Sequence, residues 1–222
     1  MRMSTLLAFV AVLTGSVAAT SPAYAVEPAC HFLPITDSAA SLQNARSVAV
    51  LYSENTLGTL QYLEDYHAVA LKGAKNPQLD SRISQAFVTS SDPARAINGL
   101  MGSLQQTFAT VTVYDSLDAA VQARPDVVVM LDAYSRLVSK RNTQVEARFM
   151  ARFYDSNLQY IGQAEGTQAQ QMPSVWVQGK SAPEIAAQID RQTALQVTAL
   201  QQFDASLTAL MKAGTVAQLA AQ

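Results

Sequence analysis

The stretch VEARFMARFYDSNLQYIGQAE, residues 145–165, predicts an antiparallel β-hairpin. Apolar and polar residues alternate along its first half, which is the period of a strand with one buried face, so Phe149 and Phe153 should face the core. With a turn centred on Ser156-Asn157, the expected pairs are Phe153 with Tyr160, Phe149 with Ala164, and Arg148 with Glu165. A slip of one residue would put the phenylalanine face in water.

Three further strands are expected at residues 47–52, 111–114 and 127–131, each a short run rich in valine. Ser116 precedes a short apolar helical segment between the last two strands and is expected to cap it. A strand, a short helix and a strand within so few residues predict a βαβ unit with a right-handed crossover. At least one pair of strands should therefore be parallel.

Asp92-Pro93 predicts the start of a helix, because aspartate accepts from free amides and proline suits the first turn. An apolar stripe from Ile97 to Phe108 then follows helical spacing. For residues 54–91 we expect a helix, and an extended hairpin remains the alternative because threonine, tyrosine and valine are frequent there.

A capping box at Ser181 to Glu184 predicts the start of a long C-terminal amphipathic helix. Its apolar stripe continues to Leu210, about 45 Å at 1.5 Å per residue. A typical strand spans only ~17–20 Å. The overhanging end should therefore pack on the chain's leader, bend, or meet a partner. Residues 214–222, from Gly214 onward, are expected to be a flexible tail.

Together these elements predict an α+β protein, an α/β sandwich. Its mixed sheet should have about five strands, with helices on one face and the long amphipathic helix at the C-terminus. The expected organisation is a signal peptide at 1–25, an extended leader at 26–45, one α/β domain at 46–213, and the tail.

The N-terminus has the pattern of a secretory signal: Arg2, an apolar run from Leu6 to Leu13, and small residues in Ala23-Tyr24-Ala25. The apolar run is too short to span a membrane, which takes about 20 residues. We expect cleavage after Ala25 and a periplasmic location, the alternatives being secretion or association with the outer membrane. Of the 222 residues, 197 would remain.

Cys30 is the only cysteine of the chain, and its context argues against lipidation. Glu27 and Pro28 precede it, where a lipidation signal has small apolar residues at the end of the apolar run. A lone cysteine cannot form an intramolecular disulfide. It is best interpreted as a loose terminal thiol, with an intermolecular bridge or a reactive thiol as the alternatives.

Charge argues against nucleic acid or anionic lipid as a partner. After loss of Arg2, 14 basic residues remain beside 17 acidic ones, a net charge of −3. Charged residues make up only 14% of the chain.

No catalytic, cofactor-binding or metal-binding residues are predicted. Gln178 to Ser181 lacks the upstream glycine of a phosphate-binding loop and is expected to be a polar loop ending in an N-cap. The two histidines, His31 and His67, have no metal-ligand framework, and His67 with Glu64 and Asp65 is expected to be a solvated patch. No Gly-x-Ser-x-Gly nucleophile elbow occurs.

Two surface features remain as candidates. Tyrosines at strand spacing and the single tryptophan are candidates for a platform that binds a sugar or peptide, although such residues more often pack a sheet: Tyr134, Tyr154, Tyr160 and Trp176. The basic residues Arg136, Lys140 and Arg141 are expected at a solvated hairpin tip, with an acidic partner surface as the alternative.

The segments SVAVLY, DPARAINGLMGSLQQTF, VTVYDSLDAAVQARPDVVVMLDA and FMARFYDSNLQYIGQAEG, followed by an amphipathic helix, resemble small periplasmic accessory proteins. These are the TolB amino-terminal domain, CsgG-type proteins, and LptE- and YajG-like lipoproteins. The resemblance covers residues 46–211 in pattern. It implies a non-enzymatic role, with a protein partner, in an envelope assembly or transport complex. The alternative is a periplasmic protein that binds a small ligand, either a lipid or a glycan.

Overall fold

The structure is a computed structural model that describes residues 42–139, 142–174 and 179–220, with side chains up to Ala213. All of them belong to the unit formed by residues 33–222. After a helical turn at residues 42–44, the elements in chain order are β1 (Ser47–Tyr52), α2 (Glu54–Ala74), α3 (Ser81–Ser90), α4 (Pro93–Thr107), β2 (Thr110–Val113), α5 (Leu117–Gln122), β3 (Val127–Arg136), β4 (Gln144–Asp155), β5 (Tyr160–Gln171) and α6 (Ala182–Ala220).

The five strands form one mixed sheet in the order β2-β1-β3-β4-β5. β1 pairs in parallel with both β2 and β3, whereas β3, β4 and β5 are antiparallel. The predicted α+β class, with a mixed five-stranded sheet and a long C-terminal helix, is thus confirmed. The strands before and after α5 are not neighbours, because β1 lies between them. The predicted parallel pairing is present, but β2 and β3 each pair with β1 instead of with one another.

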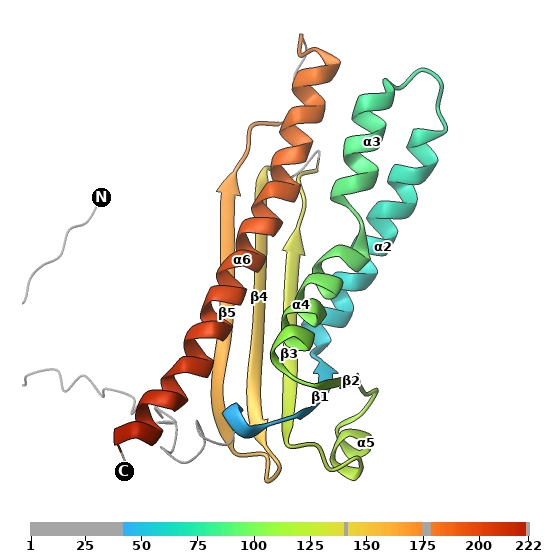
Figure 1. The fold of residues 1–222 in the computed structure, drawn as a ribbon. Coiled ribbons are helices and arrows are strands. Elements are labelled where there is room, and N and C mark those ends of the chain that lie inside the picture. The colour runs from blue at the N-terminus through green and yellow to red at the C-terminus, as the bar shows by residue number, and fades with distance from the viewer. Residues whose placement is uncertain (1–41, 140–141, 175–178, 221–222) are drawn as a thin grey trace, which may run out of the picture. The chain divides into compact units, whose positions relative to one another are not determined.

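One face of the sheet is covered by α3, α4 and α6 (Figure 1). Its core contains Leu100 and Leu104 from α4, Phe149 and Phe153 from β4, and Phe203 from α6, all of them buried. The predicted caps position these helices: Asp92 accepts from the Ala94 N–H at 3.0 Å at the start of α4. At α6, Glu184 Oε2 accepts from the Ser181 N–H at 2.7 Å.

The short helix α5 packs on the opposite face, and α2 lies along the edge of β3, so the expectation of helices on one face holds for α3, α4 and α6 only. Ala120 of α5 is fully buried against Ala49 and Leu51 of β1 and Val128 of β3. The connection from β2 to β3 has to cross β1, and α4 already occupies the other face beside β2. Ser116 caps α5 as predicted, by accepting from the Ala119 N–H at 3.2 Å.

The β4–β5 hairpin forms where it was expected, but the predicted register is wrong by two residues. The observed pairs are Phe153 with Gly162, Phe149 with Gly166, and Arg148 with Thr167. The turn has three residues instead of two and ends with Leu158 at φ 61°, which shifts the pairing by one residue. A register shift at Phe153/Tyr154 moves the pairing by one residue more. Because two single offsets preserve the alternation, both phenylalanines still face the core.

Residues 54–91 form two helices, so the prediction of a helix is confirmed and the extended hairpin is excluded. The predicted continuity is not found, because residues 75–80 separate α2 from α3. Ser53 caps α2 by accepting from the Thr56 N–H at 3.1 Å. Asp80 caps α3 by accepting from the Arg82 N–H at 2.9 Å.

α6 continues to Ala220, whereas the sequence suggested a tail from Gly214. A glycine inside a helix costs only about 1 kcal/mol relative to alanine, and the residues after it are mostly good helix formers. The 12-residue strands β4 and β5 are also about twice as long as assumed, ~40 Å each, so less of α6 overhangs them. Near its end, Met211 O accepts from the Gln43 side chain, so the leader's last residues contact α6. Those residues, 42–44, are helical instead of extended.

Candidate functional site

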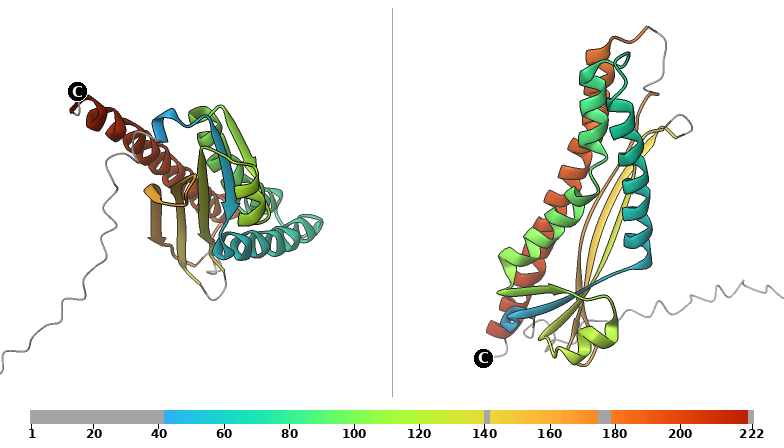
Figure 2. Two further views of the ribbon diagram at one scale, coloured as in Figure 1. Left: turned by 90° about the horizontal axis from the view of Figure 1, so that it is seen from below. Right: turned by 90° about the vertical axis from the view of Figure 1, so that its right-hand side faces the viewer.

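The candidate site begins with the sheet face opposite the main core, on β3, β4 and β5. In the described part of the chain, no helix or strand lies over the middle of this surface. α2 runs along its β3 border (Figure 2), and at the end near the β4–β5 turn Tyr154 packs against the small cluster formed with α5. We call this surface the uncovered face. It consists of Met130, Asp132, Tyr134, Arg136, Glu146, Arg148, Met150, Arg152, Tyr154, Tyr160, Gln163, Glu165, Thr167 and Ala169. Most of these side chains are half-buried, because neighbouring long side chains cover one another.

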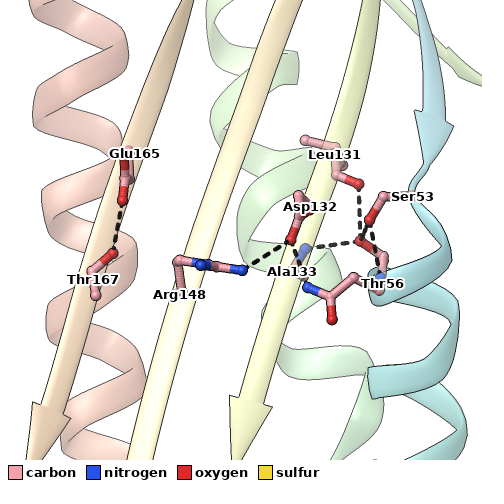
Figure 3. Close-up of polar contacts among 9 residues, drawn as sticks. Ser53, Thr56, Leu131, Asp132, Ala133, Arg148, Glu165 and Thr167 are labelled. Atoms are coloured by element: carbon pink, nitrogen blue, oxygen red, sulfur yellow. Dashed lines mark hydrogen bonds and ion pairs between the residues drawn. The ribbon is translucent and has the colours of Figure 1, made fainter. Parts of the chain in front are cut away.

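Short polar contacts hold the middle of the uncovered face in place (Figure 3). The Arg148 guanidinium lies 3.8 Å from the Asp132 carboxylate, which also accepts from Asn55 Nδ2 at 2.7 Å. Arg148 Cζ lies 6.0 Å from the centroid of the Tyr134 ring, within cation–π range. A partly exposed ion pair contributes only ~0–1 kcal/mol, so these contacts mainly orient the side chains.

The predicted aromatic platform is divided in two by the structure. Tyr154 and Tyr160 form an edge-to-face pair, with ring centroids 6.0 Å apart, beside the β4–β5 turn. Tyr134 is six residues along β3 from Val128, the residue paired with Tyr154, and therefore about 20 Å away. Trp176 lies outside the described residues.

Tyr134 instead lies near two tyrosines of α2. Tyr62 and Tyr66, one helical turn apart, have ring centroids 6.2 Å from one another, and both line the same hollow between α2 and β3 as Tyr134. Burial raises the pKa of both Tyr62 and Tyr66, so both hydroxyls stay protonated at neutral pH. This pair was not predicted, because an extended hairpin remained the alternative to a helix over residues 54–91. The i, i+4 spacing of the two tyrosines was the available signal.

α2 also satisfies the edge of β3 beyond the end of β1. Thr56 Oγ1 donates to Leu131 O and accepts from the Ala133 N–H, both at 2.8 Å. Further along, Tyr66 Oη donates to Val138 O at 3.2 Å. These groups take the place of a neighbouring strand, so this edge is not available for strand addition.

The outer edge of β5 is partly blocked in the same way by α6. The Glu165 N–H donates to Ser206 Oγ at 3.0 Å, and the Thr167 N–H donates to Gln202 Oε1 at 3.2 Å. Strand addition at a free sheet edge is one route by which a partner docks. These contacts favour the uncovered face over the β5 edge.

Two hollows adjoin the uncovered face at its α2 border. The first, which we call the groove, has a volume of about 960 Å³, lies between α2 and β3, and is lined by Glu54, Asn55, Gly58, Thr59, Tyr62, Tyr66, Tyr134, Ser135, Arg136, Leu137, Ser139 and Asn142. The second, the apolar hollow, has a volume of about 480 Å³, lies between α2 and α3, and is lined by Tyr62, Asp65, Tyr66, Val69, Ala70, Gly73, Leu79, Ser84, Phe87 and Ser139.

Other residues that the sequence singled out have structural partners. His67 is half-buried with its Nδ1 3.0 Å from Ser91 Oγ, where it joins α2 to the end of α3, so it is not part of a fully solvated patch. Lys180 Nζ donates to Ser174 O at 2.9 Å and to Gln188 Oε1 at 2.6 Å. This loop precedes the cap of α6.

Several expectations fall outside the described residues: those on Cys30, His31, Lys140, Arg141 and the signal peptide. Arg136 is described and is exposed at the end of β3. Within the described ranges, no group of three or more histidine, cysteine, aspartate or glutamate residues is placed to hold a metal ion. No helix within those ranges has both the length and the apolar character to cross a membrane.

Comparison with known proteins gives no family assignment. No family model and no curated protein matches the chain. Two solved structures of PelC dodecamers from Paraburkholderia phytofirmans, one of them a point variant, are similar to it at 13% identity, with TM-scores of 0.33 and 0.32. The alignments cover 72% and 71% of this chain, and 89% and 87% of the PelC chains. A likeness this weak carries no inference about function.

Proposed function

We propose that this chain is an exported, non-catalytic accessory protein that binds a protein partner of the cell envelope and supports an assembly or transport complex there. The observation that carries the proposal is the uncovered face of β3, β4 and β5, whose middle no described helix or strand overlies. A sheet face that remains accessible beside a large helical layer offers a rigid, preformed surface for docking.

The composition of the uncovered face supports this role. It carries three arginines, three tyrosines and two methionines, residue types that are enriched in protein–protein interfaces. It also carries three carboxylates, Asp132, Glu146 and Glu165, so charges of both signs are available for complementary pairing. Five residues of β4, each with its neighbours on β3 and β5, give this face an area of about 500 Å². Each partner of a standard interface buries more, ~800 Å². The partner would therefore also contact the β4–β5 turn at the end of this face.

Copurification from cells that produce the protein naturally tests this proposal. Arg152→Glu reverses one charge in the middle of the uncovered face, and Lys72→Glu makes the same change on the exposed surface of α2. The tagged wild type and Lys72→Glu should retain a stoichiometric partner that Arg152→Glu loses. Absence of any partner, or equal loss from both variants, would contradict the proposal.

The proposed location has its own test. Intact mass measurement of the mature protein should give the mass expected for cleavage after Ala25, with Cys30 unmodified. An acylated Cys30 at a new N-terminus would instead place the protein on a membrane. Secretion, or association with the outer membrane without acylation, would be seen by fractionation.

A second candidate function, the binding of a small lipid or glycan, is favoured by a separate observation. The groove and the apolar hollow lie side by side, and the 480 Å³ hollow has a size usual for ligand pockets, about 300–1,000 Å³. Of the uncovered face, this function involves only Tyr134 and Arg136, which also line the groove.

A further inference from the structure

We propose that the groove and the apolar hollow form one binding site for an amphiphile with an uncharged sugar head and a hydrocarbon chain. The sugar would occupy the groove and the chain the apolar hollow. This inference rests on the second candidate function and is independent of the protein partner. The inference requires that one ligand occupy both the groove and the apolar hollow, whereas the candidate function requires a ligand in only one of them.

The two hollows are continuous because they share three lining residues, Tyr62, Tyr66 and Ser139. The aromatic rings extend from one to the other: Tyr66 is 6.2 Å from Tyr62 and 6.3 Å from Phe87, between ring centroids. Tyrosine presents an apolar ring and a polar hydroxyl, so it suits the boundary between a hydrocarbon chain and a polar head.

The apolar hollow suits a hydrocarbon chain because its polar groups other than the Tyr62 hydroxyl already have partners in the protein. Tyr66 Oη donates to Val138 O at 3.2 Å, and Ser84 Oγ donates to Asp80 O at 3.2 Å. The rest of the lining is mostly aliphatic or aromatic, and Asp65 is its only charged residue. Val69 is 72% exposed on this wall, so a bound chain would remove apolar surface from water.

The groove suits an uncharged polar head. Among the described residues, its lining contains one carboxylate, Glu54, and one guanidinium, Arg136, and neither forms an ion pair with another described residue. These two charges cancel, so they provide no net positive charge to attract a phosphate or a sulfate. The carboxylate can still accept hydrogen bonds from sugar hydroxyls, and the guanidinium can donate to them.

The tyrosines of the groove add the remaining features of a sugar site. Tyr62 Oη accepts from the Leu137 N–H at 3.3 Å, which leaves its own proton available to a ligand. Burial raises the pKa of Tyr62, so this proton is retained at neutral pH. The flat rings of Tyr62 and Tyr134 provide apolar surfaces for the C–H groups of a sugar ring.

Calorimetric titration of the mature protein tests the site with three probes, each used below its critical micelle concentration. Dodecyl maltoside has both parts, maltose has the head alone, and dodecyl sulfate has the same chain with a charged head. We expect one molecule of dodecyl maltoside per chain, bound at least about tenfold more tightly than either other probe. Equal affinity for dodecyl maltoside and dodecyl sulfate would show nonspecific detergent binding and overturn the proposal.

Paired variants locate the binding. Val69→Gln in the apolar hollow should weaken dodecyl maltoside binding about tenfold, and Leu71→Gln, an exposed change on the same helix outside both hollows, should change it less than about twofold. At the other end, Arg136→Gln should weaken binding, and Arg152→Gln on the uncovered face should not. Equal effects within either pair would contradict the assignment.

Other outcomes distinguish a failure of the combined site from a failure of small-ligand binding or of partner binding. Binding of maltose alone as tightly as dodecyl maltoside would leave a glycan-binding protein and overturn the combined site. If dodecyl maltoside fails to bind and Val69→Gln converts a dimer to a monomer in sedimentation, the apolar hollow is a contact between two copies of the chain. Partner copurification, which is disrupted by Arg152→Glu, is expected to be independent of Val69→Gln.

Discussion

Gly166 of β5 lies directly against the backbone of Ala199 in α6. A Cβ atom at Gly166 would be 2.0 Å from Ala199 O and 2.5 Å from Phe203 N. The helix therefore approaches this strand at backbone distance, closer than any side chain would allow. The register of the hairpin places Gly166 opposite Phe149, so the glycine and the phenylalanine share one rung beneath α6.

Replacement of Gly166 by alanine should destabilise the fold strongly. The obstructing atoms belong to the backbone of α6 and cannot rotate away, so we expect a loss of about 3 kcal/mol or more in the free energy of unfolding. Gly102→Ala is the matched control, because a Cβ there meets nothing within 4 Å. It should stabilise α4 by about 0.5–1 kcal/mol. Urea denaturation measures both, and a Gly166→Ala protein as stable as wild type would refute this packing.

The hydroxyl of Thr56 should be essential for the edge of β3. Thr56→Val keeps the shape but leaves the buried Ala133 N–H without its partner, whereas Leu131 O still accepts from the Ser53 N–H at 2.9 Å. We therefore expect a loss of about 2 kcal/mol. Thr56→Ser keeps the hydroxyl and should cost less than about 1 kcal/mol. Equal losses in the two variants, measured by urea denaturation, would mean that packing of the methyl group is what matters.

The β4–β5 turn should be improved by glycine. Leu158 has φ 61° in a left-handed conformation that costs a non-glycine residue roughly 1 kcal/mol, and its side chain is partly exposed. Leu158→Gly should therefore raise the free energy of unfolding by up to about 1 kcal/mol, and Leu158→Val should lower it. The reverse order in thermal denaturation would favour the two-residue turn that the sequence suggested.

Acid should weaken two aspartate contacts. Hydrogen bonds from Arg82, the side chain first and then its backbone, lower the pKa of Asp80 to about 2. Backbone hydrogen bonds from Ser47 and Arg46 lower the pKa of Asp126. A carboxyl group whose pKa is lowered by folding stabilises the protein above its unfolded pKa, near 4, and loses that contribution as the pH falls through the folded value.

The corresponding measurement compares the free energy of unfolding at pH 6 and pH 2.5 for wild type and for the double variant Asp80→Asn, Asp126→Asn. The difference between the two pH values should be smaller in the variant, because these two groups no longer titrate. An unchanged difference would show that other groups cause the acid sensitivity.

Local chemistry made several elements predictable from the sequence. Asp92, Ser116 and Glu184 identified three helix starts, because a cap involves only neighbouring residues. Alternation identified the core face that carries Phe149 and Phe153. The register was not predictable in the same way. A left-handed Leu158 and an extra residue in β5 are small local deviations whose cost is offset by contacts with α6, far away in the sequence.

The candidate site depends on such distant contacts. Asn55 reaches Asp132 across 77 residues, and Tyr66 reaches Val138 across 72. Neither contact has a sequence motif, because each requires α2 to lie along the part of β3 that β1 does not reach. The predicted tyrosine platform was assigned to strands alone, and the α2 tyrosines were missed.

Photocrosslinking in the native cells tests the central claim, that the uncovered face binds a protein partner. A photoreactive residue at position 150, in place of Met150 on the uncovered face, is compared with one at position 105, in place of the exposed Gln105 on α4. We expect one discrete crosslinked protein from position 150 and none from position 105. The absence of an adduct at position 150, or the same adduct from both positions, would contradict the claim.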